Sequence, residues 1–191
     1  MAVHPPFKHS FMETDRLILR PMEVRDAHAL FEIKSDQYVT ERYGQEPHRS
    51  IEETEKWVEK RIEGYALRDS MFWIITTKDN DRAIGSVCYW NFDPTFHCAE
   101  LGYELKRSRW AMGIMSESLR RIISYGFREL GLHRIEALPL AMNESSRKVL
   151  TKLGFKLEET FRERVYFRGS YFHQLCFRML EEEWSEICAR T

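Results

Sequence analysis

Residues Arg109 to Phe127 read "RWAMGIMSESLRRIISYGF", and this stretch decides how the chain is organised. From Met115 onward, apolar side chains recur at helical spacing, which predicts an amphipathic helix packed on a core. Its first turn, Trp110 to Ile114, holds none of the Ser, Thr, Asp or Asn residues that usually cap a helix. The amide N–H groups there lack partners and carry the positive end of the helix dipole. This turn is therefore a candidate anion site.

The glycine in that turn fits the same interpretation. Gly113 has no Cβ, so the backbone beside it can approach a phosphate group closely. The alternative is a surface helix whose first N–H groups bind water and whose glycine is incidental. This stretch alone leaves both interpretations open.

The segments on either side of this helix predict an α/β (α+β) protein. Their hydrophobic periodicity gives the order β-α-α-β-β-β-α-β-α-β-β, which fits a mixed, mostly antiparallel central sheet flanked by helices on both faces. Ser50 and Glu53 have the spacing of a capping box, and Glu117 and Arg121 that of a helical ion pair. The expected strands are 15–22, 71–77, 83–90, 97–105, 134–140, 155–167 and 171–180, and the further helices are 26–34, 50–68 and 143–154.

Composition limits the classes of function. The 191 residues are 43% hydrophobic and 31% charged, without repeats or linkers, which predicts one domain over residues 1–191 with a core of about 13–181. The net charge of -1 gives no reason to expect nucleic acid or an anionic membrane as partner. The four cysteines lack metal-ligand spacing, and no apolar run is long enough for a membrane span. We expect a cytoplasmic protein with free thiols and no metal.

Two further segments carry polar groups at informative positions. Asn143 is placed to cap a helix that Gly154 closes, with Ser146 one turn inside. In the strand "AELGYEL", Glu100 and Glu104 share one face, either as a solvated surface or with one of them acting as a general base. An α-amino group, with a pKa of roughly 7.7–8.0, needs only a modest base to become a nucleophile near neutral pH.

Four segments, taken in order, resemble the GNAT acetyltransferase superfamily, and more narrowly its RimJ/RimL-type branch of ribosomal-protein N-terminal acetyltransferases. They are "AELGYEL" (99–105), the loop "WAMGIMS" (110–116), "LHRIEA" (132–137) and "NESSRKVLTKLGF" (143–155), and the likeness covers nearly the whole chain. The resemblance implies acetyl-CoA as donor and a primary amine as acceptor, most simply a protein N-terminal α-amino group. It also implies direct attack in a ternary complex.

The resemblance also implies which residues act. Glu100 is the expected base, acting through a water, and Ser146 the expected acid at the departing sulfur. Tyr171 matches a tyrosine position of the branch, and Glu104 and Glu163 remain alternative bases. Trp110 and Met115 depart from the phosphate-loop signature Q/R-x-x-G-x-G/A. The expected contacts with acetyl-CoA are Leu105, Trp110, Ala111, Met112, Gly113, Ile114, Met115, Asn143 and Ser146.

Two other functions stay open at this point. One is acetylation of a small amine such as a polyamine or an aminoglycoside, for which an acidic pocket formed by Glu41, Glu46, Glu52 and Glu53 is a candidate. The other is a non-catalytic module that binds coenzyme A, suggested by the two departures in the phosphate loop. Since dimers occur in the family, a homodimer is among the expected assemblies.

Overall fold

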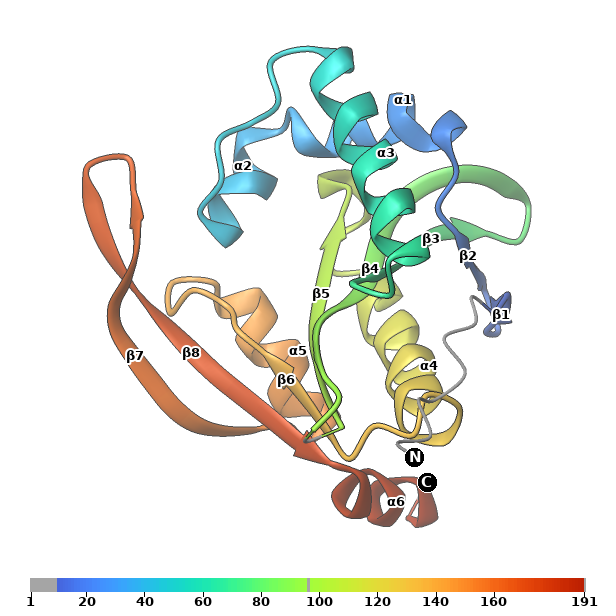
Figure 1. Cartoon of the computed structure of the whole chain (residues 1–191), viewed down its shortest axis with the longest axis vertical. Coiled ribbons are helices and arrows are strands. Elements are labelled where there is room, and N and C mark those ends of the chain that lie inside the picture. Colours follow the sequence, from blue (N-terminus) through green and yellow to red (C-terminus); the bar gives the residue numbers. More distant parts are fainter. Residues whose placement is uncertain (1–9, 96, 191) are drawn as a thin grey trace.

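A computed structural model describes residues 10–95 and 97–190 (Figure 1). One sheet takes its strands in the order β1-β2-β3-β4-β5-β6-β8-β7, and among these described strands only β5 and β6 pair in parallel. The predicted mixed, mostly antiparallel sheet is confirmed. The strands are β1 (Met12–Glu13), β2 (Leu17–Pro21), β3 (Met71–Thr77), β4 (Asn80–Asp93), β5 (Cys98–Leu105), β6 (Arg134–Ala137), β7 (Lys156–Phe167) and β8 (Ser170–Leu180). The helices are α1 (Ala27–Lys34), α2 (Gln37–Thr40), α3 (Ile51–Ala66), α4 (Ile114–Arg128), α5 (Glu144–Leu153) and α6 (Glu181–Ala189).

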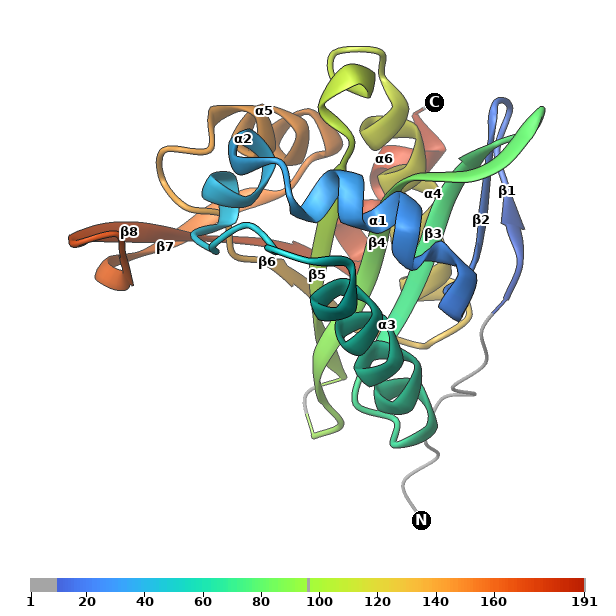
Figure 2. The same cartoon turned by 90° about the horizontal axis from the view of Figure 1, so that it is seen from above.

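Helices cover the sheet on both faces, as expected. Figure 2 shows α1 and α3 on one side and α4 on the other. Strand β3 lies between two hydrophobic clusters: Phe72 and Ile74 belong to the cluster under α1 and α3, whereas Trp73 and Ile75 belong to the cluster under α4. Successive side chains of a strand point to opposite faces, so a strand buried on both faces must be apolar throughout.

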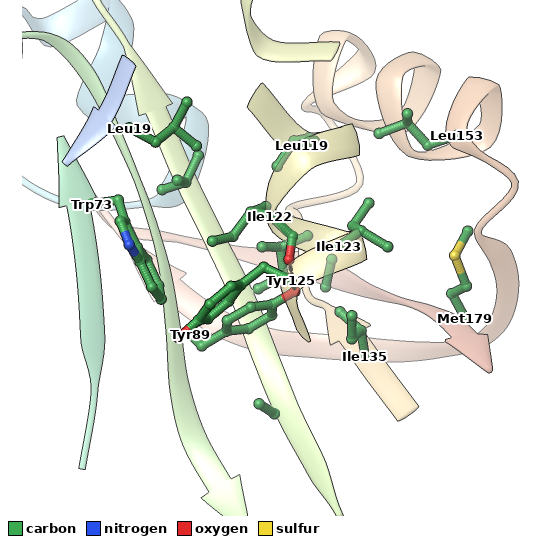
Figure 3. Packing of buried hydrophobic residues seen from close by; sticks show 14 of the residues in the cluster. Leu19, Trp73, Tyr89, Leu119, Ile122, Ile123, Tyr125, Ile135, Leu153 and Met179 are labelled. Carbon is green, nitrogen blue, oxygen red and sulfur yellow. Dashed lines mark hydrogen bonds between the residues drawn. The ribbon is translucent and has the colours of Figure 1, made fainter. Parts of the chain in front are cut away.

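Helix α4 packs directly onto the centre of the sheet. Leu119, Ile122 and Ile123 are fully buried in the larger cluster (Figure 3). The Tyr89 hydroxyl donates to the carbonyl oxygen of Ile122 at 3.0 Å. Gly126 makes this approach possible, because a Cβ there would lie 2.5 Å from the Tyr89 oxygen. These contacts fix the position of α4, and with it the uncapped first turn.

Two local predictions about helix surfaces were wrong. Ser50 takes the N-cap position of α3, but Glu53 accepts from the amide of Arg49 at 2.7 Å, so no capping box forms. Glu117 does not pair with Arg121. It pairs instead with Arg16, 2.6 Å away across the chain, because the segment before β2 runs beside the start of α4.

The end of the chain forms a long hairpin and a final helix. The β7–β8 hairpin extends well beyond its neighbours in the sheet (Figure 1). Helix α6, like β1 and α2, is an element that the sequence did not predict. In the part of the chain that the structure describes, no helix is long and apolar enough to cross a bilayer.

Candidate active site

The site begins where two central strands separate. The β5–β6 ladder runs from Cys98 and Arg134 to Glu100 and Glu136 and then stops. Strand β5 continues to Leu105, but the chain after β6 turns toward β8, where the amide of Leu175 donates to the carbonyl of Pro139 at 2.9 Å. The edge of β5 beyond Glu100 is therefore not covered by β6. Backbone groups on such an edge are available to a bound molecule.

A cavity of about 290 Å³ opens at this separation. It reaches both faces of the sheet, because its walls come from helices on both sides. Side chains from α1 and α3 form one wall, and the segment from β6 to the start of α5 forms the other. Among the lining residues are Lys34, Arg42, Trp57, Arg61, Trp90, Glu100, Gly102, Tyr103, Glu104, Leu138, Asn143 and Ser146.

A glycine is required at position 102 because of a side chain on the neighbouring strand β4, and not because β5 and β6 separate. A Cβ at this position would lie 2.8 Å from the sulfur of Cys88, its partner on β4. The glycine therefore lets the buried Cys88 side chain pack beneath the floor of the cavity.

The two carboxylates on the cavity face of β5 have different surroundings. Glu104 accepts hydrogen bonds from Lys34 Nζ, the Tyr43 hydroxyl and the Ser86 hydroxyl at 3.1, 3.1 and 3.2 Å. Glu100 accepts from Asn91 Nδ2 at 2.8 Å and forms no ion pair with a described residue. Burial raises the pKa of Glu100. A carboxylate with few partners and a raised pKa is the better proton acceptor of the two.

Ser146 meets a tyrosine that comes from the sheet. Its hydroxyl lies 2.6 Å from the Tyr103 hydroxyl, and burial raises the pKa of Tyr103 to about 12. Asn143 caps α5 as predicted, because its Oδ1 accepts from the amide of Ser146 at 3.1 Å. Its Nδ2 donates to the carbonyl of Arg42 at 3.1 Å. Ser146 is thus held at one end of the cavity beside a phenol that remains protonated near neutral pH.

The loop before α4 adopts an unusual backbone. Ala111 and Gly113 have positive φ angles of 60° and 77°, and Gly113 is the N-cap of α4 without any side-chain cap. The Trp110 indole donates to the carbonyl of Leu105 at 2.8 Å, which joins the loop to the end of β5. Arg16 donates to the carbonyl of Met112 at 3.1 Å. The first amides of α4 therefore have no side-chain cap, which suits an anionic group, while the nearby Arg16 is paired with Glu117.

Comparison with known proteins identifies the family. The model of the acetyltransferase (GNAT) domain matches residues 16–156. The uncharacterized N-acetyltransferase YoaA of Bacillus subtilis (strain 168) is 36% identical over 159 residues, which cover 83% of this chain and 90% of that protein. The chain belongs to the GNAT acetyltransferase family.

More distant members share the architecture. The [Ribosomal protein uS5]-alanine N-acetyltransferase of Escherichia coli (strain K12) is 25% identical over 183 residues, covering 91% of this chain and 92% of that protein. The structure of RimL, a ribosomal L7/L12 alpha-N-protein acetyltransferase in complex with coenzyme A, superposes with a TM-score of 0.82 at 22% identity. It covers 90% of this chain and 98% of RimL. The expected GNAT fold and acyltransferase class are confirmed, with acetyl-CoA as the acetyl donor of the family.

Within the GNAT site, the structure gathers some of the predicted residues and not others. Glu100, Asn143 and Ser146 line one cavity. Tyr171 is 64% exposed on the β7–β8 hairpin, where its ring contacts Tyr166, and it lies outside the cavity lining. Its catalytic role stays a prediction that rests on the family resemblance. The predicted acetyl-CoA contacts 105 and 110–115 lie along the end of β5 and the start of α4, outside the cavity lining.

The other predicted residues have clear positions too. Glu163 is exposed at a β-bulge of β7, and its amide donates to His173 Nδ1 at 2.9 Å. Met115 is half-buried against the core, as the helical period predicts. None of Glu41, Glu46, Glu52 and Glu53 is among the residues that line the cavity.

Sequence reasoning missed two residues that line this cavity, Tyr103 and Arg61. Tyr103 lies on the face of β5 opposite Glu100, as alternation along a strand requires, and the separation of β5 and β6 connects the two faces. Arg61 was missed because a helix contributes it from far away in the sequence. The spacing of Trp57 and Arg61, four residues apart on one side of α3, was the available signal. Across residues 10–95 and 97–190, no group of three or more His, Cys, Asp and Glu side chains is arranged to hold a metal ion.

Proposed function

We propose that this protein acetylates a protein N-terminal α-amino group, of the kind found on ribosomal proteins, by direct attack on acetyl-CoA in a ternary complex. The observation that carries the proposal is the arrangement of one cavity: Glu100 lies on its β5 floor, and the Ser146–Tyr103 pair lies at the start of α5. Relatives named as ribosomal-protein acetyltransferases support the choice of acceptor.

In this reaction the amine nitrogen attacks the thioester carbonyl carbon, the new C–N bond forms and the C–S bond breaks. Glu100, through a water, takes the proton that the ammonium group loses. Ser146 donates a hydrogen bond or proton to the departing thiolate, and Tyr103, which stays protonated, supports the Ser146 hydroxyl. The products are the acetylated amine, which is an amide, and the free thiol of coenzyme A.

Acetyl-CoA would reach this site from the start of α4. Its pyrophosphate would accept from the first amides of the helix, from Gly113 to Met115, in place of the missing side-chain cap. The pantetheine arm would follow the uncovered edge of β5 and pass Asn143. Trp110 and Met115 differ from the family signature, but both side chains pack on protein, which leaves the backbone amides free for this role.

The charges of the cavity bear on the choice of acceptor. Lys34, Arg42 and Arg61 contribute three cationic side chains, whereas Glu100 and Glu104 contribute two acidic ones. Glu104 is already paired with Lys34. A polyamine or an aminoglycoside carries several positive charges and would be repelled by such walls. A peptide N-terminus carries a single positive charge and would be repelled less.

The test is acetyl transfer itself. The protein is incubated with acetyl-CoA and either a peptide with a free N-terminus, the same peptide with a blocked N-terminus and a free lysine, or spermidine. Thiol release and the mass of the product are measured. We expect transfer to the free N-terminus. Transfer only to spermidine would favour the small-amine alternative, and binding of acetyl-CoA without thiol release with any acceptor would favour a non-catalytic module.

A further inference from the structure

Two cations of the cavity, Arg42 and Arg61, meet aromatic rings and no carboxylate among the described residues, and Arg61 contacts three rings. The guanidinium carbon of Arg61 lies 5.2 Å from the ring centre of Trp57, 5.4 Å from that of Phe72 and 6.0 Å from that of Trp90. Cation–π contacts of this kind orient a guanidinium group without neutralising its charge. Arg61 is therefore fixed in place on the α3 wall of the cavity while its charge remains unpaired.

No carboxylate of the described chain compensates this charge. Arg61 forms no ion pair with any residue in 10–95 or 97–190, and its buried Nε has no hydrogen-bond partner there. The two acidic side chains of the cavity are engaged elsewhere, Glu104 with Lys34 and Glu100 with Asn91. Arg61 is half-buried and its Nε is out of water, so an unpaired guanidinium group at this cavity wall points to an anionic group on the bound molecule.

Arg61 lies on the same side of the sheet as Glu100, the proposed base for the reacting amine. Trp90 pairs across the β4–β5 ladder with Glu100, the proposed base, and its ring also contacts Arg61. Glu100 and Arg61 thus both lie beside the Trp90 indole ring. A molecule whose amine approaches Glu100 therefore passes the same indole ring that Arg61 contacts.

We propose that Arg61 binds a carboxylate of the acceptor, so that the enzyme selects N-termini with an acidic side chain within their first two residues. The proposal rests on the function proposed above and specifies its substrate class. A guanidinium group binds a carboxylate through two parallel hydrogen bonds, which gives direction as well as affinity. An acceptor of this kind presents its amine to Glu100 and its carboxylate to Arg61 at the same time.

The test compares peptides that differ by one charge. Two pairs are used, Asp-Ser against Asn-Ser and Ser-Asp against Ser-Asn at the first two positions, each followed by the same neutral sequence. The wild-type protein should show a kcat/KM at least about tenfold higher for the Asp member of one pair, because a buried ionic hydrogen bond discriminates strongly against its neutral analogue. In Arg61→Met the ratio should fall to about one, and Arg61→Lys should keep part of it.

Controls separate the possible results. Lys60→Met removes a neighbouring charge from the exposed side of α3 and should leave the ratio unchanged. Thermal melts establish that each variant is folded at the assay temperature. Equal rates for both members of each pair in the wild type, or an unchanged ratio in Arg61→Met, would overturn the role of Arg61 while leaving the proposed function intact. Absence of acetylation of all four peptides would instead contradict the proposed function.

Discussion

Two arginines with opposite surroundings distinguish the framework of this protein from its site. Arg20, on β2, is 4% exposed and donates to both oxygens of Asp26, at 2.7 and 2.9 Å, and to Asp81 at 2.6 Å. Arg61, on α3, meets three aromatic rings and no carboxylate among the described residues. The first charge is neutralised within the fold, whereas the second is left for a molecule from outside.

The same difference holds for other polar groups around the cavity. Glu104 accepts from a cation and two hydroxyl groups, whereas Glu100 accepts from Asn91 and has no cationic donor among the described residues. The start of α5 is capped by Asn143, and the start of α4 has only Gly113. Paired groups tie helices to the sheet, and groups with missing partners gather where acetyl-CoA and the acceptor would bind. Pairing, more than residue type, indicates which charges are structural.

The largest expected effect is on stability at the paired arginine. Arg20→Met leaves the buried Asp26 carboxylate without its cation, so the free energy of unfolding should fall by about 3–5 kcal/mol. Arg61→Met removes a charge that has no carboxylate partner and should cost far less. Urea denaturation of both variants measures the difference. Equal losses of unfolding free energy in the two variants would show that pairing with a carboxylate does not distinguish a structural arginine from a binding arginine.

The two carboxylates should differ in the same manner. Glu100→Gln should lower turnover at neutral pH about tenfold, because the variant cannot accept the proton of the amine and must use the small fraction that is already free. Its stability at neutral pH should not fall, since ionising a carboxyl whose pKa burial has raised opposes folding. Glu104→Gln leaves Lys34 buried without its counter-charge and should cost about 3 kcal/mol of stability. Kinetics and urea denaturation of both variants test whether Glu100 mainly affects turnover and Glu104 mainly affects stability. A Glu104→Gln variant as stable as the wild type would contradict this difference.

The smallest of these effects concerns the uncapped helix start. Gly113→Ala adds a Cβ 3.4 Å from Arg16 Nη2, beside the amides proposed to bind the pyrophosphate. Affinity for acetyl-CoA should fall about tenfold, in addition to a backbone strain of about 1 kcal/mol. Gly131→Ala is the matched control near the other end of α4, with a φ of 65° and no atom close to the added Cβ. It should show the strain without the loss of affinity. Calorimetric titration with acetyl-CoA distinguishes the two, and equal affinities would remove the loop from the site.

Much of this architecture could be predicted from local pattern. The amphipathic period of α4, the cap and the closing glycine of α5 and the alternation of β5 each depend on neighbouring residues, and each appears where expected. Glu100 and Ser146 line one cavity because β5 and α5 carry them there. The wrong predictions, the Ser50–Glu53 box and the Glu117–Arg121 pair, also used local spacing. In both cases a backbone or side chain elsewhere competed successfully for the carboxylate.

Contacts between distant segments could not be predicted in this way. Tyr103 reaches Ser146 only because β5 and β6 separate, and that separation depends on how the chain turns after β6. Arg61 becomes part of the site because α3 packs over β3 and β4, where Phe72 and Trp90 contact it. Neither the Tyr103–Ser146 contact nor the placement of Arg61 can be predicted from a single sequence, because each results from tertiary packing.

The most direct test of the account is the pH dependence of kcat/KM for wild type and Glu100→Gln with the same N-terminal peptide. With Glu100 present, the rate should decline on the acid side only as this carboxyl, with its raised pKa, takes up a proton. The variant depends on free amine alone, so its deficit should be widest below the amine pKa of roughly 7.7–8.0 and should narrow above it. That convergence would establish Glu100 as the base. A ratio of the two rates that stays constant at every pH would contradict it.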